Sequence, residues 1–213
     1  MKNPFKSSFA RKYDAIVRKS RMDDYRIAAK EIAQRISGGR ILDVGAGPSY
    51  VDIEIAKLGD FEIVALDDSK EMVKIAKRNV TEAEVSHKIE VNLGSAEDLP
   101  FDDGTFDFII SIGSLHFWKA PLKVLEEIYR VLRNGGTGMI GDLCRDAPEE
   151  EIAKITDKMS SVFARRGFRN TVKQGCTQQE VERMLRWTGF QYEIENSGAN
   201  LMVWLKKLRD FPA

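Results

Sequence analysis

A glycine-containing turn and an acidic pair are the residues whose types and spacing point most directly to chemistry. The apolar stretch that ends at Val44 runs into Gly45-Ala46-Gly47, and Asp67-Asp68 closes the next apolar stretch about twenty residues later. Because glycine has no Cβ, the backbone at the turn can approach a ligand closely. A carboxylate at that spacing can accept hydrogen bonds from the two hydroxyls of a ribose. The pattern predicts a nucleotide-type cofactor at the carboxyl end of a parallel sheet, bound by Gly45, Ala46, Gly47, Asp67 and Asp68.

The number of glycines in the turn distinguishes a dinucleotide cofactor from a cofactor without a pyrophosphate. A dinucleotide fingerprint reads Gly-x-Gly-x-x-Gly, and its third glycine lets the turn and helix sit against a pyrophosphate. Tyr50 occupies that third position in this chain. A nicotinamide-dependent oxidoreductase is therefore disfavoured. A two-glycine turn also occurs as a plain strand–helix connection, so the turn alone does not specify the ligand.

His116 is the candidate catalytic residue. It lies just beyond the apolar stretch 106–112, and open α/β sheets bind their ligands beyond the ends of such strands. Imidazole exchanges a proton near neutral pH, which suits a general base; a structural histidine bonded to the backbone is the alternative. Cys144 and Cys176 form no metal-binding pattern with His116, and we expect no metal site.

Alternating apolar and amphipathic stretches indicate the elements that position these residues. The first forty residues have helical periodicity that ends at Gly38-Gly39, and Tyr13 in this segment is a candidate to cap the cofactor. Ser69 is expected to cap a helix, and Pro121 to begin one. This alternation is typical of an α/β doubly wound parallel sheet. We expect strands at 40–44, 61–66, 88–92, 106–112 and 136–141, and helices at 49–58, 69–79 and 119–132.

The pattern changes after residue 142. Residues 148–166 are expected to form one charged helix and residues 177–188 another. Two short strands follow, at 190–195 and 200–206, and the Asn-Ser-Gly between them is typical of a hairpin turn. The sequence thus predicts a Rossmann-like, doubly wound, seven-stranded sheet that is mostly parallel and ends in an antiparallel hairpin.

Length and composition restrict the class of protein. The 213 residues, 43% hydrophobic and 31% charged, suit a single globular domain, and no apolar run approaches the length of a membrane span. The N-terminus lacks the apolar region of a secretory signal, and two cysteines suggest a reducing environment, so we expect a cytoplasmic protein. No exposed apolar stripe is evident, so we expect a monomer. Within 1–213 we expect an N-terminal helical lid (1–39), a cofactor-binding core (40–141), a helical acceptor-side segment (142–189) and a terminal hairpin (190–206).

The charges are unevenly distributed although the net charge is zero. Residues 1–40 contain eleven Lys and Arg and four Asp and Glu, a local balance of 11 − 4 = +7. A solvated helix face explains this balance. A cationic lid over an anionic substrate, with Arg11, Arg18 and Arg21, is the alternative.

Five segments in this order resemble motifs of the class I S-adenosylmethionine-dependent methyltransferases, in particular their small type 11 branch. The resemblance covers roughly residues 36–143 and implies S-adenosyl-L-methionine as cofactor, with S-adenosyl-L-homocysteine as product. The segments are 43–47, 66–72, 94–101, 106–111 and 127–136.

The resemblance also implies roles for single residues. Met72 is implied to pack on the adenine, and Ser111 to reach the rim of the active site. Ser49 replaces the third glycine of the family, and Ser95 replaces its usual aspartate, so the contact to the adenine amino group stays open. The residues implied beside the adenine are Ser95, Ala96 and Glu97.

The function we expect is in-line methyl transfer to a small molecule, because residues 143–190 contain no recognisable nucleic-acid module. Nucleic acid and membrane are not expected partners. An RNA or protein methyltransferase is an alternative, with a basic patch formed by the first helix together with Arg165, Arg166 and Arg169. A module that binds S-adenosylmethionine without catalysis is another. The acceptor and its nucleophilic atom have no signature in the sequence.

Overall fold

The computed structural model describes residues 7–159 and 161–208. The strands are β1 (Gly39–Val44), β2 (Phe61–Asp67), β3 (Ile89–Leu93), β4 (Phe106–Ile112), β5 (Leu132–Leu143), β6 (Phe190–Ser197) and β7 (Asn200–Lys207). Across this part of the chain they form one sheet of seven strands in the order β3-β2-β1-β4-β5-β7-β6. Strands β1 to β5 are parallel, whereas β7 is antiparallel to both β5 and β6. The predicted fold class is confirmed.

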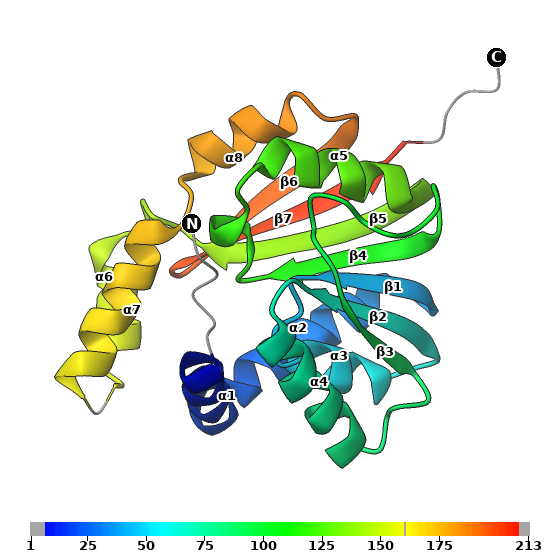
Figure 1. Cartoon of the computed structure of the whole chain (residues 1–213). Coiled ribbons are helices and arrows are strands. Elements are labelled where there is room, and N and C mark those ends of the chain that lie inside the picture. Colours follow the sequence, from blue (N-terminus) through cyan, green and yellow to red (C-terminus); the bar gives the residue numbers. More distant parts are fainter. Residues whose placement is uncertain (1–6, 160, 209–213) are drawn as a thin grey trace.

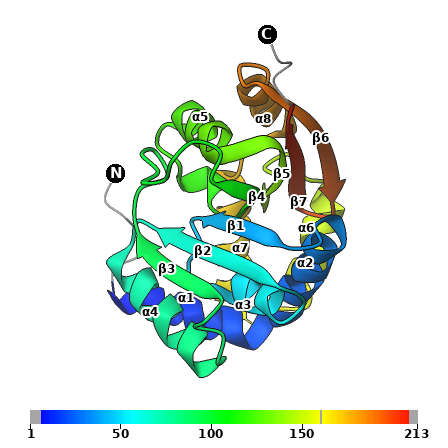
Figure 2. The same ribbon diagram turned by 90° about the vertical axis from the view of Figure 1, so that its right-hand side faces the viewer.

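Helices cover both faces of the sheet. They are α1 (Ser7–Ser20), α2 (Met22–Arg35), α3 (Tyr50–Ala56), α4 (Lys70–Glu82), α5 (Pro121–Val131), α6 (Glu149–Thr156), α7 (Val162–Gln174) and α8 (Gln178–Leu185), with a 3₁₀ turn η1 (Leu115–Phe117). Helices α2, α3 and α4 lie on one face, and α5 and α8 lie on the other (Figure 1). The view turned by 90° shows the twist of the sheet from β3 to β6 (Figure 2). Among the described helices, none is both long and apolar enough to cross a membrane.

Alternate residues of each central strand enter different cores. Ile41 and Ile63 pack in the core under α2 and α3, whereas Leu42 and Val64 pack in the core under α5 and α8. Strands buried on both faces have nearly continuous apolar sequences. This is why the positions of the strands could be predicted.

Local capping residues set several helix ends. The Ser69 hydroxyl accepts a hydrogen bond from the Met72 N–H at 3.3 Å, and α5 begins at Pro121, as predicted. Thr177 and Glu180 form a reciprocal capping box at the start of α8.

The structure corrects the prediction of one helix over residues 148–166. Two helices, α6 and α7, occupy this region, and the Ser161 hydroxyl caps α7 by accepting from the Ala164 N–H. A small cluster of Ile152, Val172 and Ala199 buries one side of each helix against the hairpin turn. Because that contact joins residues distant in sequence, the helical period of the local segment does not reveal the break. The N-terminal helical region is likewise divided, at Arg21.

The topology brings the candidate residues to one edge of the sheet. The strand order reverses between β1 and β4, and ligands in open α/β sheets bind at such a switch point, beyond the carboxyl ends of the strands. Helices α1, α6 and α7 lie beyond the same edge (Figure 1).

Candidate functional site

The glycine turn follows β1 and is held against β2 and the loop after β4. The N–H groups of Gly45 and Ala46 both donate to the Leu66 carbonyl, at 2.8 and 3.0 Å. Gly45 has a φ of +81°, and a Cβ there would lie 2.6 Å from the Cβ of Ser114. A Cβ on Gly47 would meet nothing within 4 Å. The turn is therefore tightly packed on one side and open on the other.

Asp67 faces this turn. Its Oδ2 accepts a hydrogen bond from the Gly47 N–H at 2.8 Å, and its Oδ1 accepts from the Ser69 N–H at 2.9 Å. Burial raises the pKa of Asp67 to about 6, and the charge of Asp68, an exposed neighbour, acts in the same direction. Each carboxylate oxygen has a second lone pair available for a hydroxyl donor. The geometry suits two ribose hydroxyls, and this role for Asp67 stays a prediction.

Ser111 and Ser114 fix the end of β1. Both hydroxyls donate to the Val44 carbonyl, at 2.8 and 3.0 Å, and their oxygens lie 2.5 Å apart. Ser111 is fully buried. Ser111 therefore fixes the backbone directly before the glycine turn. A contact between Ser111 and the cofactor stays a prediction.

The loop after β3 carries the residues expected beside the adenine. Ser95 is exposed, and its hydroxyl accepts from the Glu97 N–H at 3.2 Å. Glu97 in turn accepts from the Ala120 N–H at 3.2 Å, and half-buried Ala96 packs against the core under α5. The Glu97 carboxylate thus binds the backbone at the start of α5. None of these contacts identifies a residue that binds adenine.

Met72 and Tyr13 lie where α1 meets α4. Met72 is only 1% exposed and packs in one cluster with Ala10 and Ile75, which Tyr13 joins. Tyr13 also hydrogen-bonds Tyr25. Helix α1 therefore covers Met72, and the predicted contacts of both Met72 and Tyr13 with the cofactor stay predictions.

A polar network fastens α1 over the glycine turn. Asp14 accepts from the Tyr50 hydroxyl and from Arg78, each at 2.6 Å, and the Asn79 amide donates to the Pro48 carbonyl at 3.0 Å. Burial alone would raise the pKa of Asp14, but the hydrogen bonds that Asp14 accepts from Tyr50, Arg78 and Asn79 lower that pKa below its ordinary value. Arg18, proposed for a cationic lid, is bonded to Tyr50, Asn79 and Glu82 instead.

His116 and Asp142 form a buried pair at the carboxyl ends of β4 and β5. His116 Nδ1 lies 2.8 and 2.9 Å from the two Asp142 oxygens, and the His116 backbone N–H donates to Asp142 at 3.0 Å. The two side chains are 4% and 1% exposed. Because a carboxylate only accepts hydrogen bonds, Nδ1 carries the proton of the neutral ring and Nε2 is left as an acceptor. Nε2 is buried without a hydrogen-bond partner among the described residues.

A further buried pair consists of two carboxyl groups, those of Asp43 and Asp52, next to the glycine turn. Asp43 is 2% exposed and Asp52 is 0% exposed, and neither oxygen of Asp52 has a hydrogen bond of normal geometry within the described chain. Burial raises the pKa of Asp52 to about 6. Burial and the neighbouring Asp52 raise the pKa of Asp43 well above its ordinary value. Ser49, which replaces the family glycine, precedes α3 with a left-handed φ of 59°.

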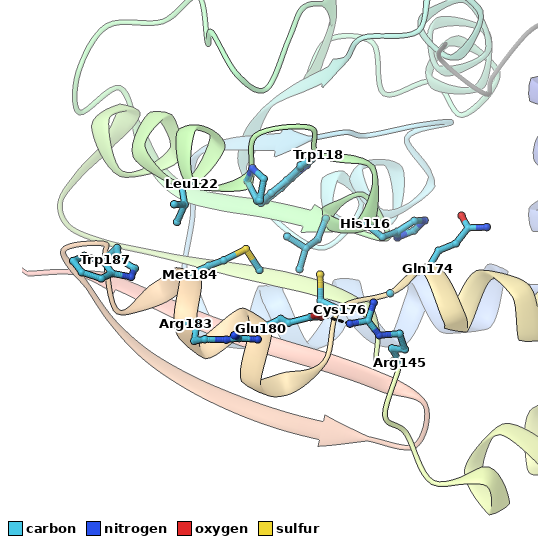
Figure 3. Close-up of a pocket in the computed structure, with 13 residues that line it drawn as sticks. His116, Trp118, Leu122, Arg145, Gln174, Cys176, Glu180, Arg183, Met184 and Trp187 are labelled. Carbon is cyan, nitrogen blue, oxygen red and sulfur yellow. Dashed lines mark hydrogen bonds and ion pairs between the residues drawn. The ribbon is translucent and has the colours of Figure 1, made fainter. Parts of the chain in front are cut away.

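A pocket of about 550 Å³ begins at His116 and runs between η1, α5 and α8. His116, Cys176 and Arg145 lie at one end, and Leu122 and Trp187 lie at the other (Figure 3). Cys144 pairs with Cys176 in an isolated β-bridge, and burial raises the pKa of the Cys144 thiol to about 11 and also raises that of Cys176. Both thiols are therefore poor nucleophiles at neutral pH.

Several residues of the site were not predicted from the sequence. Asp142 lies at the end of the strand next to β4, and that position was its only signal. Glu127 and Arg130 of α5 hold the loop after β3: Glu127 accepts from the Leu99 N–H at 2.7 Å, and Arg130 donates to the Phe101 carbonyl at 2.7 Å. His87, the other histidine of the chain, is exposed on the surface.

The sheet order and the glycine turn define a Rossmann-like protein that binds a nucleotide-type cofactor. Known proteins specify the family. A family model for a methyltransferase domain of type 11 matches residues 42–140. A Methanococcus maripaludis protein assigned to the S-adenosyl-L-methionine-dependent methyltransferases superimposes with a TM-score of 0.82 at 30% identity, over 99% of this chain and 97% of that one. The chain belongs to the class I S-adenosylmethionine-dependent methyltransferases, in the type 11 branch.

Two curated relatives have assigned activities. The 2-methyl-6-phytyl-1,4-hydroquinone methyltransferase 2 of rice, Oryza sativa, is 39% identical over 48% of this chain and 29% of that protein. A ubiquinone/menaquinone biosynthesis C-methyltransferase of Geobacter is 30% identical over 66% of this chain and 63% of that protein. The chain thus spans less than two thirds of the length of these relatives.

Proposed function

We propose that this protein transfers a methyl group from S-adenosylmethionine to a small molecule whose nucleophile loses a proton to His116. The buried, unpartnered Nε2 of His116, with Nδ1 fixed by Asp142, is the observation that carries the proposal. Ser114, two residues earlier, touches the glycine turn, so the proton acceptor lies close to the cofactor site.

The residues around the turn fit the family's cofactor. The open side of Gly47 leaves room for a ligand, and Asp67 has lone pairs for two ribose hydroxyls. S-adenosylmethionine, when bound, supplies a methyl group on a positively charged sulfur, which keeps the electron pair as the new bond to the acceptor forms. The protein then has to align the acceptor, exclude water and take up its proton.

A hydroquinone or related phenol is the acceptor class that we favour. The names of the rice and Geobacter relatives refer to hydroquinone and quinone chemistry. Loss of a phenolic proton makes both the oxygen and the ring carbon beside it nucleophilic. His116 can therefore take the hydroxyl proton for O-methylation. In C-methylation the carbon ortho to the hydroxyl forms the new bond, and that carbon then loses its hydrogen as a proton while the oxygen regains one, which restores the aromatic ring.

An RNA acceptor lacks a comparable observation. Arg169 is paired with Glu149, and Arg18 with Glu82. These two arginines of the predicted basic patches are thus partly neutralised within the protein. Salt-dependent RNA binding would revive this alternative.

The test combines binding and turnover. Calorimetry with S-adenosylmethionine measures the cofactor site, and formation of S-adenosylhomocysteine with methylhydroquinone and 4-methylcatechol measures transfer. His116→Ala and Asp142→Asn should lower turnover by about 100- to 10,000-fold, with cofactor affinity within about twofold of the wild type. His87→Ala at the surface should change neither. Absence of cofactor binding refutes the proposal. Turnover of His116→Ala equal to that of the wild type would show that His116 is not the base. Binding without turnover on any phenol would favour a non-catalytic module.

A further inference from the structure

We propose that the pocket between α5 and α8 binds the apolar tail of the acceptor, so that the substrate is a phenol or hydroquinone with a hydrocarbon chain. This inference rests on the proposed function, because the reacting hydroxyl is assigned to the His116 end. The pocket volume of about 550 Å³ lies in the middle of the range of about 300–1,000 Å³ typical of small-molecule sites. An aromatic ring alone would leave much of it empty.

The inner end of the pocket is the polar end. His116 lines this end beside Gln174 and Cys176 (Figure 3), and its Nε2 is buried without a hydrogen-bond partner among the described residues. A neutral imidazole nitrogen accepts a hydrogen bond, which matches a phenolic hydroxyl. The hydroxyl of the acceptor therefore belongs at this end.

The outer part of the pocket is apolar and partly open. Trp118 and Met184 line its middle, and Leu122 and Trp187 lie at its far end (Figure 3). Leu122 is 44% exposed and Trp187 is 84% exposed. Large apolar side chains gathered at the mouth of a pocket gain free energy when a hydrocarbon chain covers them.

The charged residues of the pocket argue against a cationic acceptor. Glu180 is the one carboxylate that lines it among the described residues, and Glu180 is already paired with Arg145. Arg183 adds a second positive charge at the wall. An amine or a polycation would meet an excess of positive charge, whereas a neutral phenol with an alkyl chain would not.

The experiment compares 4-octylphenol with 4-methylphenol, which share the hydroxyl end and differ in the tail. Binding is measured by calorimetry with S-adenosylhomocysteine present, below the concentration at which octylphenol aggregates. Burial of each methylene strengthens binding about fourfold, so burial of three or more predicts at least about 50-fold tighter binding of octylphenol. Equal affinity for the two phenols would overturn the proposal.

Variants locate the tail. Leu122→Glu and Met184→Glu should each weaken octylphenol binding at least about tenfold without changing methylphenol binding or cofactor affinity. Leu58→Glu is the matched control, because Leu58 is 47% exposed and does not line the pocket. Equal loss in Leu58→Glu, or no loss in either pocket variant, would refute the assignment. If the cofactor binds and only short phenols are methylated, the tail site fails while the proposed function stands.

Discussion

Asp52→Asn should stabilise this protein, and the gain should depend on pH. The wild-type carboxyl is fully buried without a hydrogen bond of normal geometry, beside a second buried carboxyl at Asp43. A buried group left unsatisfied costs about 1–3 kcal/mol, and more when charged. The rise of the Asp52 pKa from 3.8 to about 6 corresponds to about 3 kcal/mol at about 1.4 kcal/mol per unit. Asparagine keeps the shape of the side chain, carries no charge and can donate to Asp43.

The direction of the pH effect follows from proton binding. Because the folded state holds the Asp52 proton more tightly than the unfolded chain, the contribution of Asp52 to wild-type stability is greatest below pH 4 and is lost as the pH rises through about 6. Asp52→Asn removes that loss. At pH 8 we expect a gain of about 2–3 kcal/mol in the free energy of unfolding, or about 5–10 °C in Tm for a chain of this size.

Thermal unfolding of the cofactor-free protein at pH 5, 6.5 and 8 measures this effect. The difference in Tm between variant and wild type should change little between pH 8 and pH 6.5, where Asp52 is mostly ionised, and should fall to about half at pH 5. Asp102→Asn is the control at an exposed carboxylate, where a surface substitution changes stability by less than about 0.5 kcal/mol. An unchanged Tm at pH 8, or a gain that is equal at pH 5 and pH 8, would show that the pair is satisfied in the folded state.

Three further predictions follow from the cofactor side of the molecule. Asp67→Ala should weaken S-adenosylmethionine binding by roughly 1.5–3 kcal/mol for each of two charge-assisted hydrogen bonds; an unchanged Kd in calorimetry would remove the ribose assignment. Ser49→Gly should raise Tm by about 2–4 °C, because a left-handed φ of 59° costs a serine about 1–2 kcal/mol; a lower Tm would mean that the hydroxyl stabilises the loop. Asp14→Ala should speed tryptic cleavage within α1, because it removes the acceptor for Tyr50 and Arg78; an unaltered cleavage rate would show that apolar contacts alone hold the helix.

The sequence reveals those parts of the fold that depend on local patterns. Strands such as β2 and β4 are apolar along most of their length because both faces are buried, and Ser69 and Pro121 mark helix starts by local chemistry. The break between α6 and α7 depends on a contact of Ile152 with residues far along the chain. No local period carries that information.

The candidate site likewise combines residues that local sequence patterns reveal with residues that only long-range contacts bring together. His116 could be proposed from its place after an apolar stretch, whereas its partner Asp142 is 26 residues away. Only the adjacency of β4 and β5 joins them. Asp52 shares the short helix α3 with a second acidic residue, Glu54, and nothing in the sequence signals that the Asp52 carboxylate is buried next to Asp43.

The two sides of the site come from separate stretches of chain. The glycine turn and Asp67 lie between residues 39 and 67, whereas the walls of the pocket are supplied by residues 115–187. The match to the methyltransferase domain model ends at residue 140, before α7 and α8 begin. With the pocket as the proposed acceptor site, substitutions in α8 leave the glycine turn and Asp67 unchanged, so the acceptor side can be altered while the proposed donor-side residues are kept. A library of substitutions confined to residues 174–187 is accordingly the smallest set of variants in which to search for new methyl acceptors.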